Sequence, residues 1–163
     1  VRRDGRVDPS AANNYAIRKA SENGHVEVEK LLLSDKRVDP SAANNYAIRA
    51  ASAKGHVEVA KLLLSDKRVD PLAVNNYAIR KASENGHSEV VKLLLADKRV
   101  NPSSDDNYAI MEDLKYDHVE VVKLLLQDER VKLFTKDELI NYISSIYKND
   151  DIKFLLEKCK FNN

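Results

Sequence analysis

Four histidines recur at one position of a repeated segment and are the first residues of this sequence to suggest chemistry. They are 31 residues apart, at His25, His56, His87 and His118. If each belongs to one layer of stacked helices, neighbouring layers lie about 8–10 Å apart, whereas one metal ion needs ligands at about 2 Å. The spacing therefore predicts no shared metal, and we expect each histidine to bond the local turn between its two helices.

Residue combinations for catalysis are also missing from the pattern. Cys159 is the only cysteine and no histidine follows His118, so no thiolate–imidazole pair is indicated. No two glycines fall within one short loop, which argues against a phosphate-binding loop. The adjacent acids at 105–106 and 150–151 read as turn or cap residues. We therefore predict that the chain is not an enzyme and that it uses no metal or cofactor.

Composition argues against further classes of function. The chain has 27 basic and 26 acidic side chains, a formal net charge of +1, which gives no general attraction for nucleic acid. Its apolar runs, such as Leu31–Leu33, are far shorter than the ~20 residues of a membrane-spanning helix. No signal peptide is recognisable. We expect no nucleic-acid or membrane partner and an intracellular, cytoplasmic location.

A fixed period organises the chain. Valines recur every 31 residues at Val7, Val38, Val69, Val100 and Val131. The unit at 39–69 differs from that at 8–38 at 4 of 31 positions, the unit at 70–100 differs at 5, and the unit at 101–131 is more divergent. Such a period predicts a solenoid, in which each unit buries its apolar face only against its neighbours.

Each unit predicts a loop followed by two short helices. In the first unit Asp8 and Pro9 are turn residues, Asn14 is placed to cap a helix over about 15–23, and Gly24 is placed to end it. A second helix is expected over about 26–34. The predicted buried faces are Ile17, Ala20 and Ser21 in the first helix and Val28, Leu31 and Leu32 in the second.

The unit resembles the ankyrin repeat. The resemblance rests on Tyr-Ala-Ile-Arg-Lys-Ala-Ser-Glu-Asn-Gly-His followed by Val-Glu-Val-Glu-Lys-Leu-Leu-Leu, and it spans 8–131. It implies an all-α, helix-turn-helix solenoid that binds proteins, and it is closest to the variant found in large DNA viruses and some protists, so a host-cell cytoplasm also fits. The period is 31 where the family usually has 33. Tyr15 and Arg18 replace the family's Thr and His, so another interaction must satisfy the first helix.

The two ends differ from the repeated units. Residues 1–7 match the end of a unit, so we predict an uncapped N-terminal face and either a longer array or a partner covering it. The segment 132–163 contains a capping box at Thr135–Glu138 and apolar residues at helical spacing, which predicts a degenerate C-terminal capping unit. The domain plan is a partial unit at 1–7, four repeats at 8–38, 39–69, 70–100 and 101–131, and capping helices at 132–163.

Charged and aromatic residues form ladders along the array. The basic ladders, Lys36-Arg37, Lys67-Arg68, Lys98-Arg99 and Arg18, Arg49, Arg80, either pair with neighbouring acids such as Asp35 or form a groove for an acidic partner. The tyrosines at 15, 46, 77 and 108 either pack between repeats or stack on a ligand.

Positions that vary among the copies indicate a contact surface. The resemblance to ankyrin repeats implies that the loop tip and the end of the first helix line a concave face that grips partners, although surface positions also drift freely. The matching residues are Ala12, Ala43, Val74 and Asp105; Glu22, Ala53, Glu84 and Lys115; and Asn23, Lys54, Asn85 and Tyr116. Leu72 and Met111 add apolar groups near Val74 and Tyr116, so we expect binding to centre on repeats three and four.

Three functions remain open. The leading one is a protein–protein interaction module that binds a protein partner on its concave face. The second is a structural scaffold that self-associates by stacking through the N-terminal face. The third is the targeting region of a larger enzyme.

Overall fold

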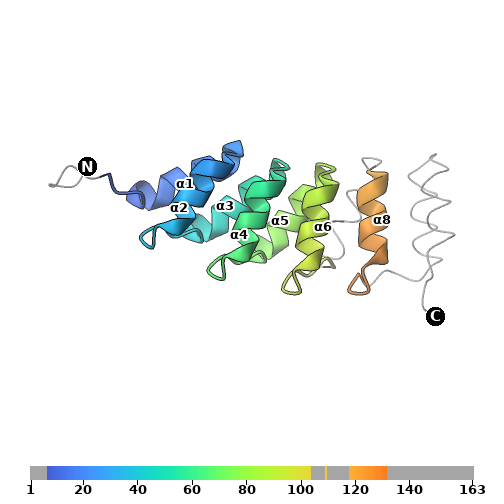
Figure 1. The fold of residues 1–163 in the computed structure, drawn as a ribbon. Coiled ribbons are helices and arrows are strands. Elements are labelled where there is room, and N and C mark those ends of the chain that lie inside the picture. The colour runs from blue at the N-terminus through green and yellow to red at the C-terminus, as the bar shows by residue number, and fades with distance from the viewer. Residues whose placement is uncertain (1–6, 104–108, 110–117, 132–163) are drawn as a thin grey trace.

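The computed structural model describes residues 7–103, 109 and 118–131, and in these residues the chain forms helices and no strands, as an all-α repeat solenoid requires (Figure 1). The first helices of the units are α1 (Ala11–Asn23), α3 (Ala42–Ala53) and α5 (Ala73–Glu84). The second helices are α2 (Val26–Ser34), α4 (Val57–Ser65), α6 (Ser88–Ala96) and α8 (Val119–Gln127). The predicted end of a unit before Val7 and the predicted capping unit at 132–163 lie outside the described residues.

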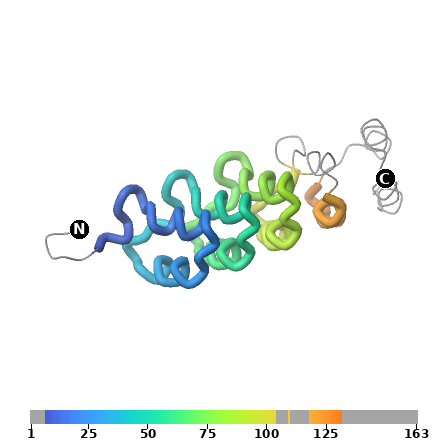
Figure 2. Tube along the Cα trace, turned by 90° about the horizontal axis from the view of Figure 1, so that it is seen from above, coloured from blue at the N-terminus to red at the C-terminus, as the bar shows by residue number. Residues whose placement is uncertain are grey.

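The helices form two parallel rows. Figure 1 shows α2, α4, α6 and α8 side by side along one layer, with α1, α3 and α5 along the other, and Figure 2 shows the same progression from above. The first helices pack more extensively against one another than the second helices do. The first helices therefore lie close together. We call their outer side the first-helix face and define it by residues 12, 22 and 23, their counterparts in the other units and the residues around them.

The core is built from small or branched residues that repeat along the array. Ile17, Ile48 and Ile79 of the first helices are fully buried, and Ala20 and Ser21 are buried beside Ile17 as expected. In the second helices Leu63 and Leu94 are fully buried. Apolar burial of this kind contributes about 25 cal/mol per Å².

The predicted buried stripe of the first unit is wrong at two positions. Val28 is 47% exposed and Leu31 is 72% exposed, whereas Val59, the counterpart of Val28, is 0% exposed. The difference arises because the preceding unit, and not the residue's own helix pair, covers this position. A residue that the pattern did not single out, Glu29, is buried instead.

The predicted N-cap role of Asn14 is also wrong. Ala12, Asn13 and Asn14 have φ values of 51°, 55° and 56°, so a left-handed turn precedes the right-handed part of α1. The side-chain amide oxygen of Asn14 accepts a hydrogen bond from the backbone N–H of Asp39 in the next unit, at 2.8 Å. Asparagine tolerates left-handed backbone better than most residues, and here its side chain connects units instead of capping its own helix. The same turn and bond recur at Asn45 and Asn76.

The expectation that each histidine bonds its own turn is also wrong where the bonds are described, because these histidines connect units. The Nε2 atom of His56 lies 3.0 Å from the carbonyl oxygen of Glu22, and that of His87 lies 3.1 Å from the carbonyl oxygen of Ala53. A carbonyl can only accept, so each Nε2 carries the proton. The imidazole fits because the facing residue is a glycine: a Cβ on Gly24, whose φ is +71°, would lie 2.7 Å from Nδ1 of His56.

Candidate interaction surface

The turns that begin the units present small or apolar side chains on the first-helix face. Ala12 is exposed, Ala43 is half-buried and Val74 is 48% exposed. In the third unit the carboxylate of Asp70 accepts a hydrogen bond from the backbone N–H of Leu72 at 3.0 Å. This bond fixes the turn while the Leu72 side chain stays 37% exposed. The third unit therefore exposes two apolar side chains where the first two units have Ser and Ala.

An arginine holds the left-handed turn in each of the first two units. Arg18 donates from Nε to the carbonyl oxygen of Asn13 at 3.0 Å and from Nη2 to that of Ala12 at 3.2 Å. Arg49 makes the equivalent bonds to Asn44 and Ala43 at 2.9 and 3.2 Å. These bonds provide the interaction that the missing Thr and His would otherwise supply, and the sequence had indicated only that a replacement must exist.

The same arginines lie between tyrosines of successive units. The guanidinium carbon of Arg18 is 5.8 Å from the ring centre of Tyr15 and 5.6 Å from that of Tyr46. Arg49 lies 5.7 Å from Tyr46 and 5.2 Å from Tyr77. A cation over an aromatic face is favourable by about 0.5–1 kcal/mol where exposed. Tyr46 and Tyr77 thus pack against arginines of the preceding unit, whereas Tyr15 is 53% exposed and Tyr108 lies outside the described residues.

The ends of the first helices carry the remaining predicted contact positions. Asn23 and Lys54 are exposed and Ala53 is half-buried. Glu22 is ion-paired with Lys19 at 2.6 Å, and Glu84 makes the equivalent pair with Lys81. The hydrogen bond from Lys19 holds the pKa of Glu22 below its usual range.

Asn85 has a structural bond as well as an exposed position. Its side-chain N–H donates to the carbonyl oxygen of Ala53 in the preceding unit at 2.9 Å. The turns therefore carry small or apolar groups, whereas at the helix ends Glu22, Glu84 and Asn85 are paired or bonded. The other four predicted contacts, Asp105, Met111, Lys115 and Tyr116, lie outside the described residues.

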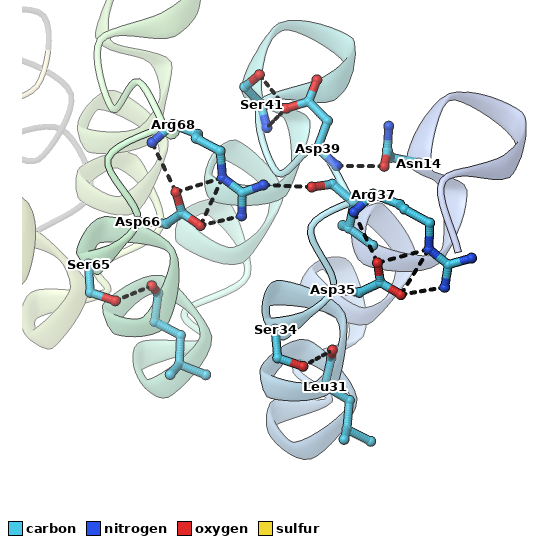
Figure 3. Close-up of polar contacts among 12 residues, drawn as sticks. Asn14, Leu31, Ser34, Asp35, Arg37, Asp39, Ser41, Ser65, Asp66 and Arg68 are labelled. Atoms are coloured by element: carbon cyan, nitrogen blue, oxygen red, sulfur yellow. Dashed lines mark hydrogen bonds and ion pairs between the residues drawn. The ribbon is translucent and has the colours of Figure 1, made fainter. Parts of the chain in front are cut away.

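A second arginine series fixes the turns that follow the second helices. Figure 3 shows Arg68 paired with Asp66, at 2.6 Å from Nη2, while its Nη1 donates to the carbonyl oxygen of Val38 at 2.8 Å. Arg99 bonds Asp97 and Val69 in the same way. Hydrogen bonds from Arg37 hold the pKa of Asp35 at about 2. These pairs confirm the prediction that the arginines of this ladder pair with the adjacent aspartates, and they also join successive units.

One buried acid escaped the sequence analysis. Glu29 is 0% exposed, and its Oε1 and Oε2 atoms lie 3.0 and 3.1 Å from the hydroxyl of Ser21. Burial raises the pKa of Glu29 to about 7, against the opposing effect of the Ser21 hydrogen bond. Comparison of the copies contained a signal, because Ala60, Val91 and Val122 occupy the same position.

Two further structural searches bear on chemistry. Among the described residues, no group of three or more His, Cys, Asp or Glu side chains is arranged to hold a metal ion. In the same part of the chain, no helix combines the length and apolar character needed to cross a membrane.

Comparison with known families gives two matches. A family profile described as "Ankyrin repeats (3 copies)" matches residues 50–137. A second profile, "Ankyrin repeats (many copies)", matches residues 17–64. A search of curated proteins found no match to this chain. The two matched ranges together run from residue 17 to residue 137.

Proposed function

Because the chain belongs to the ankyrin repeat family, we propose that it binds a protein partner on the first-helix face, with contact centred on the third and fourth units. Ankyrin repeats generally mediate protein–protein interaction and are generally not catalytic. Because the first helices pack closely side by side, a partner seated on this face touches several units at once.

The exposed pair Leu72 and Val74 carries the proposal. Their side chains are 37% and 48% exposed, and the first two units show that the fold accepts Ser and Ala at these positions. Val74 also adopts φ +57°, which is uncommon for a β-branched residue. Backbone strain kept at a surface turn is a reason to look for function there.

Rigidity supports the same surface. In the third turn Asn76 accepts a hydrogen bond from the backbone N–H of Asn101 and Asp70 accepts one from that of Leu72, so few groups must be ordered when a partner binds. Ordering a flexible side chain costs about 0.5–1.5 kcal/mol. A preformed face therefore needs less contact area to reach a given affinity.

The test restores the third turn to the sequence of the first two. The double variant Leu72→Ser, Val74→Ala should keep the helicity and the urea midpoint of the wild-type chain. In quantitative affinity capture it should lose most of the proteins that bind the wild-type chain. The affinity for a partner thus identified is then measured with purified components. Val7→Ser, which removes a side chain that is 77% exposed, serves as the control. Undiminished affinity of the double variant would refute the proposed centre.

Self-association is a second candidate, favoured by a separate observation. Val28 and Leu31 are 47% and 72% exposed at the face where later units pack on their neighbours. If copies of the chain stack there, the sedimentation coefficient should rise with concentration and Leu31→Glu should prevent the rise. A concentration-independent monomer in the wild-type chain would exclude this function.

A further inference from the structure

A shallow hollow lies on the opposite side of the array, between α2 and α4. It has a volume of about 480 Å³ and is lined by Lys30, Leu33, Ser34, Leu62, Ser65, Asp66 and Lys67. Two leucines and two lysines, one of each from neighbouring units, give it both apolar and cationic character. None of these residues belongs to the first-helix face.

The polar groups of the hollow leave a positive charge open to a ligand. Asp66 is occupied by Arg68, and the hydroxyls of Ser34 and Ser65 donate to backbone carbonyl oxygens of their own helices. Lys67 is exposed, and no ion pair or hydrogen bond of its side chain occurs within the described residues. The charge of Asp66 is thus neutralised by Arg68, whereas the charge of Lys67 is not neutralised by a described residue.

The second lysine of the hollow is available at little cost. Lys30 contacts Glu27 at 2.7 Å, and the Glu27 side chain is 82% exposed. An exposed pair of this kind contributes only about 0.3–0.5 kcal/mol. A ligand carboxylate placed between Lys30 and Lys67 can therefore replace Glu27.

The arrangement repeats once and then changes sign. Between α4 and α6 the equivalent lysines are Lys61 and Lys98, both exposed. Between α6 and α8 they are Lys92 and Glu129. The second-helix side thus has two successive lysine pairs, followed by a position where an acid replaces the second lysine.

The spacing between successive lysine pairs indicates which backbone conformation a bound peptide would have. Neighbouring helices pack about 8–10 Å apart, and a polyproline II helix advances about 3.1 Å per residue with three residues per turn. Every third side chain therefore lies on one side of such a peptide at about the spacing of the units. A β-strand alternates its side chains and cannot present every third one to the same surface.

We propose that the second-helix side binds an extended acidic segment of a partner protein, in polyproline II conformation, with one carboxylate at Lys30–Lys67 and the next at Lys61–Lys98. Leu33 and Leu62 provide an apolar floor for the residues between the carboxylates. A nucleic acid fits less well, because the charges of a phosphate chain recur more closely along the strand than the lysine pairs do.

The experiment uses a fluorescent peptide of repeated Glu-Pro-Pro triplets and measures anisotropy at low salt. The wild-type chain should bind it, and Lys67→Glu with Lys98→Glu should weaken binding by at least about tenfold, because attraction becomes repulsion. The matched variant Lys67→Arg with Lys98→Arg should bind within about twofold, since charge is retained. Glu129→Lys should tighten binding of a longer peptide of the same triplets by completing a third lysine pair.

Two comparison ligands make the proposal specific. A peptide of the same composition with its glutamates in one block, and a single-stranded oligonucleotide, should both bind more weakly than the triplet peptide. Equal binding of the blocked peptide would overturn the spacing argument, and stronger binding of the oligonucleotide would overturn the peptide assignment. Circular dichroism of each variant confirms that its helices are intact. Absence of binding to the wild-type chain would refute the proposal outright.

Discussion

At the scale of single residues, Glu29 is the side chain least explained by the repeat. Its counterparts Ala60 and Val91 are fully buried apolar residues, so the fold does not require an acid there. Ser52 and Ser83, the counterparts of Ser21, are buried hydroxyls with no hydrogen-bond partner in the described part of the chain. The Ser21–Glu29 bond is thus confined to one unit, where it partly compensates the burial of the carboxyl group.

Stability should depend on pH through Glu29. Its pKa is about 7 in the folded chain and near 4.5 when unfolded, so the folded chain holds the extra proton between these values. The free energy of unfolding therefore falls as pH rises from about 4.5 to about 7 and is flat above. Glu29→Val should remove this fall, giving a variant that is more stable at pH 8 by up to about 3 kcal/mol.

Urea unfolding at several pH values measures this effect. Glu27→Gln is the control, because Glu27 lies two residues earlier with a side chain that is 82% exposed. If Glu29→Val and the control show the same dependence on pH as the wild-type chain, the carboxyl of Glu29 titrates normally and its burial is not costly.

Gly55 joins two constraints in one residue. Its φ is +74°, and a Cβ there would lie 2.7 Å from Nδ1 of His87. Gly55→Ala should lower the free energy of unfolding by about 1–2 kcal/mol for the left-handed backbone alone, and by more for the contact. Adding His87→Ala should recover only the contact part. A single variant as stable as the wild-type chain in urea would show that the loop relaxes freely.

At the scale of elements, the Arg–Tyr ladder replaces the family's usual support for the first helix. Arg49→Lys keeps the charge but loses the planar group that bonds two carbonyl oxygens and lies between two rings. We expect the free energy of unfolding to fall by about 1–3 kcal/mol. Lys61→Arg, on an exposed site, should change it by less than about 0.5 kcal/mol. Equal effects of the two exchanges in urea unfolding would mean that the ladder adds no stability.

The same elements show how far the sequence could be interpreted. The 31-residue period predicted the helix pairs, and the bounds expected for α2 agree with Val26–Ser34. The period could not show which residues Asn14 and His56 bond, because their partners lie in the neighbouring unit. A repeated sequence does not say which residues of two neighbouring copies are in contact. The left-handed turn was missed because Ala and Asn at 12–14 also fit a helix start.

The candidate surface was predictable only in part. Differences between copies located Leu72 and Val74, and the structure places both on the surface. The same comparison also selected Glu22 and Asn85, whose side chains are engaged in an ion pair and an inter-unit bond. Variation among copies does not separate a contact from a local pair, and at the position of Glu29 the varying residue is buried.

At the scale of the whole molecule, neighbouring units are joined by polar bonds that recur along the array and by an apolar layer. The bonds are those of Asn14 to Asp39, His56 to Glu22 and Arg68 to Val38. Each of these bonds spans adjacent units, so within residues 7–103, 109 and 118–131 the units are held together by their neighbours. The loss of unfolding free energy caused by a substitution should then depend on whether the substituted residue's unit has a neighbouring unit on both sides.

Two leucine truncations test this layered arrangement. Leu63 is 0% exposed between neighbouring units, and Leu31 is 72% exposed. Leu63→Ala should lower the free energy of unfolding by about 2–5 kcal/mol, because it leaves a cavity in a layer that both neighbours help to close. Leu31→Ala removes the same atoms from a position that the described chain leaves open, and it should cost less than about 0.5 kcal/mol. Hydrogen exchange should show the loss of protection from Leu63→Ala strongest in α3 and α4 and weaker with distance. Equal losses for the two variants, or a uniform loss along the array, would mean that the chain has one shared core and not a stack of layers.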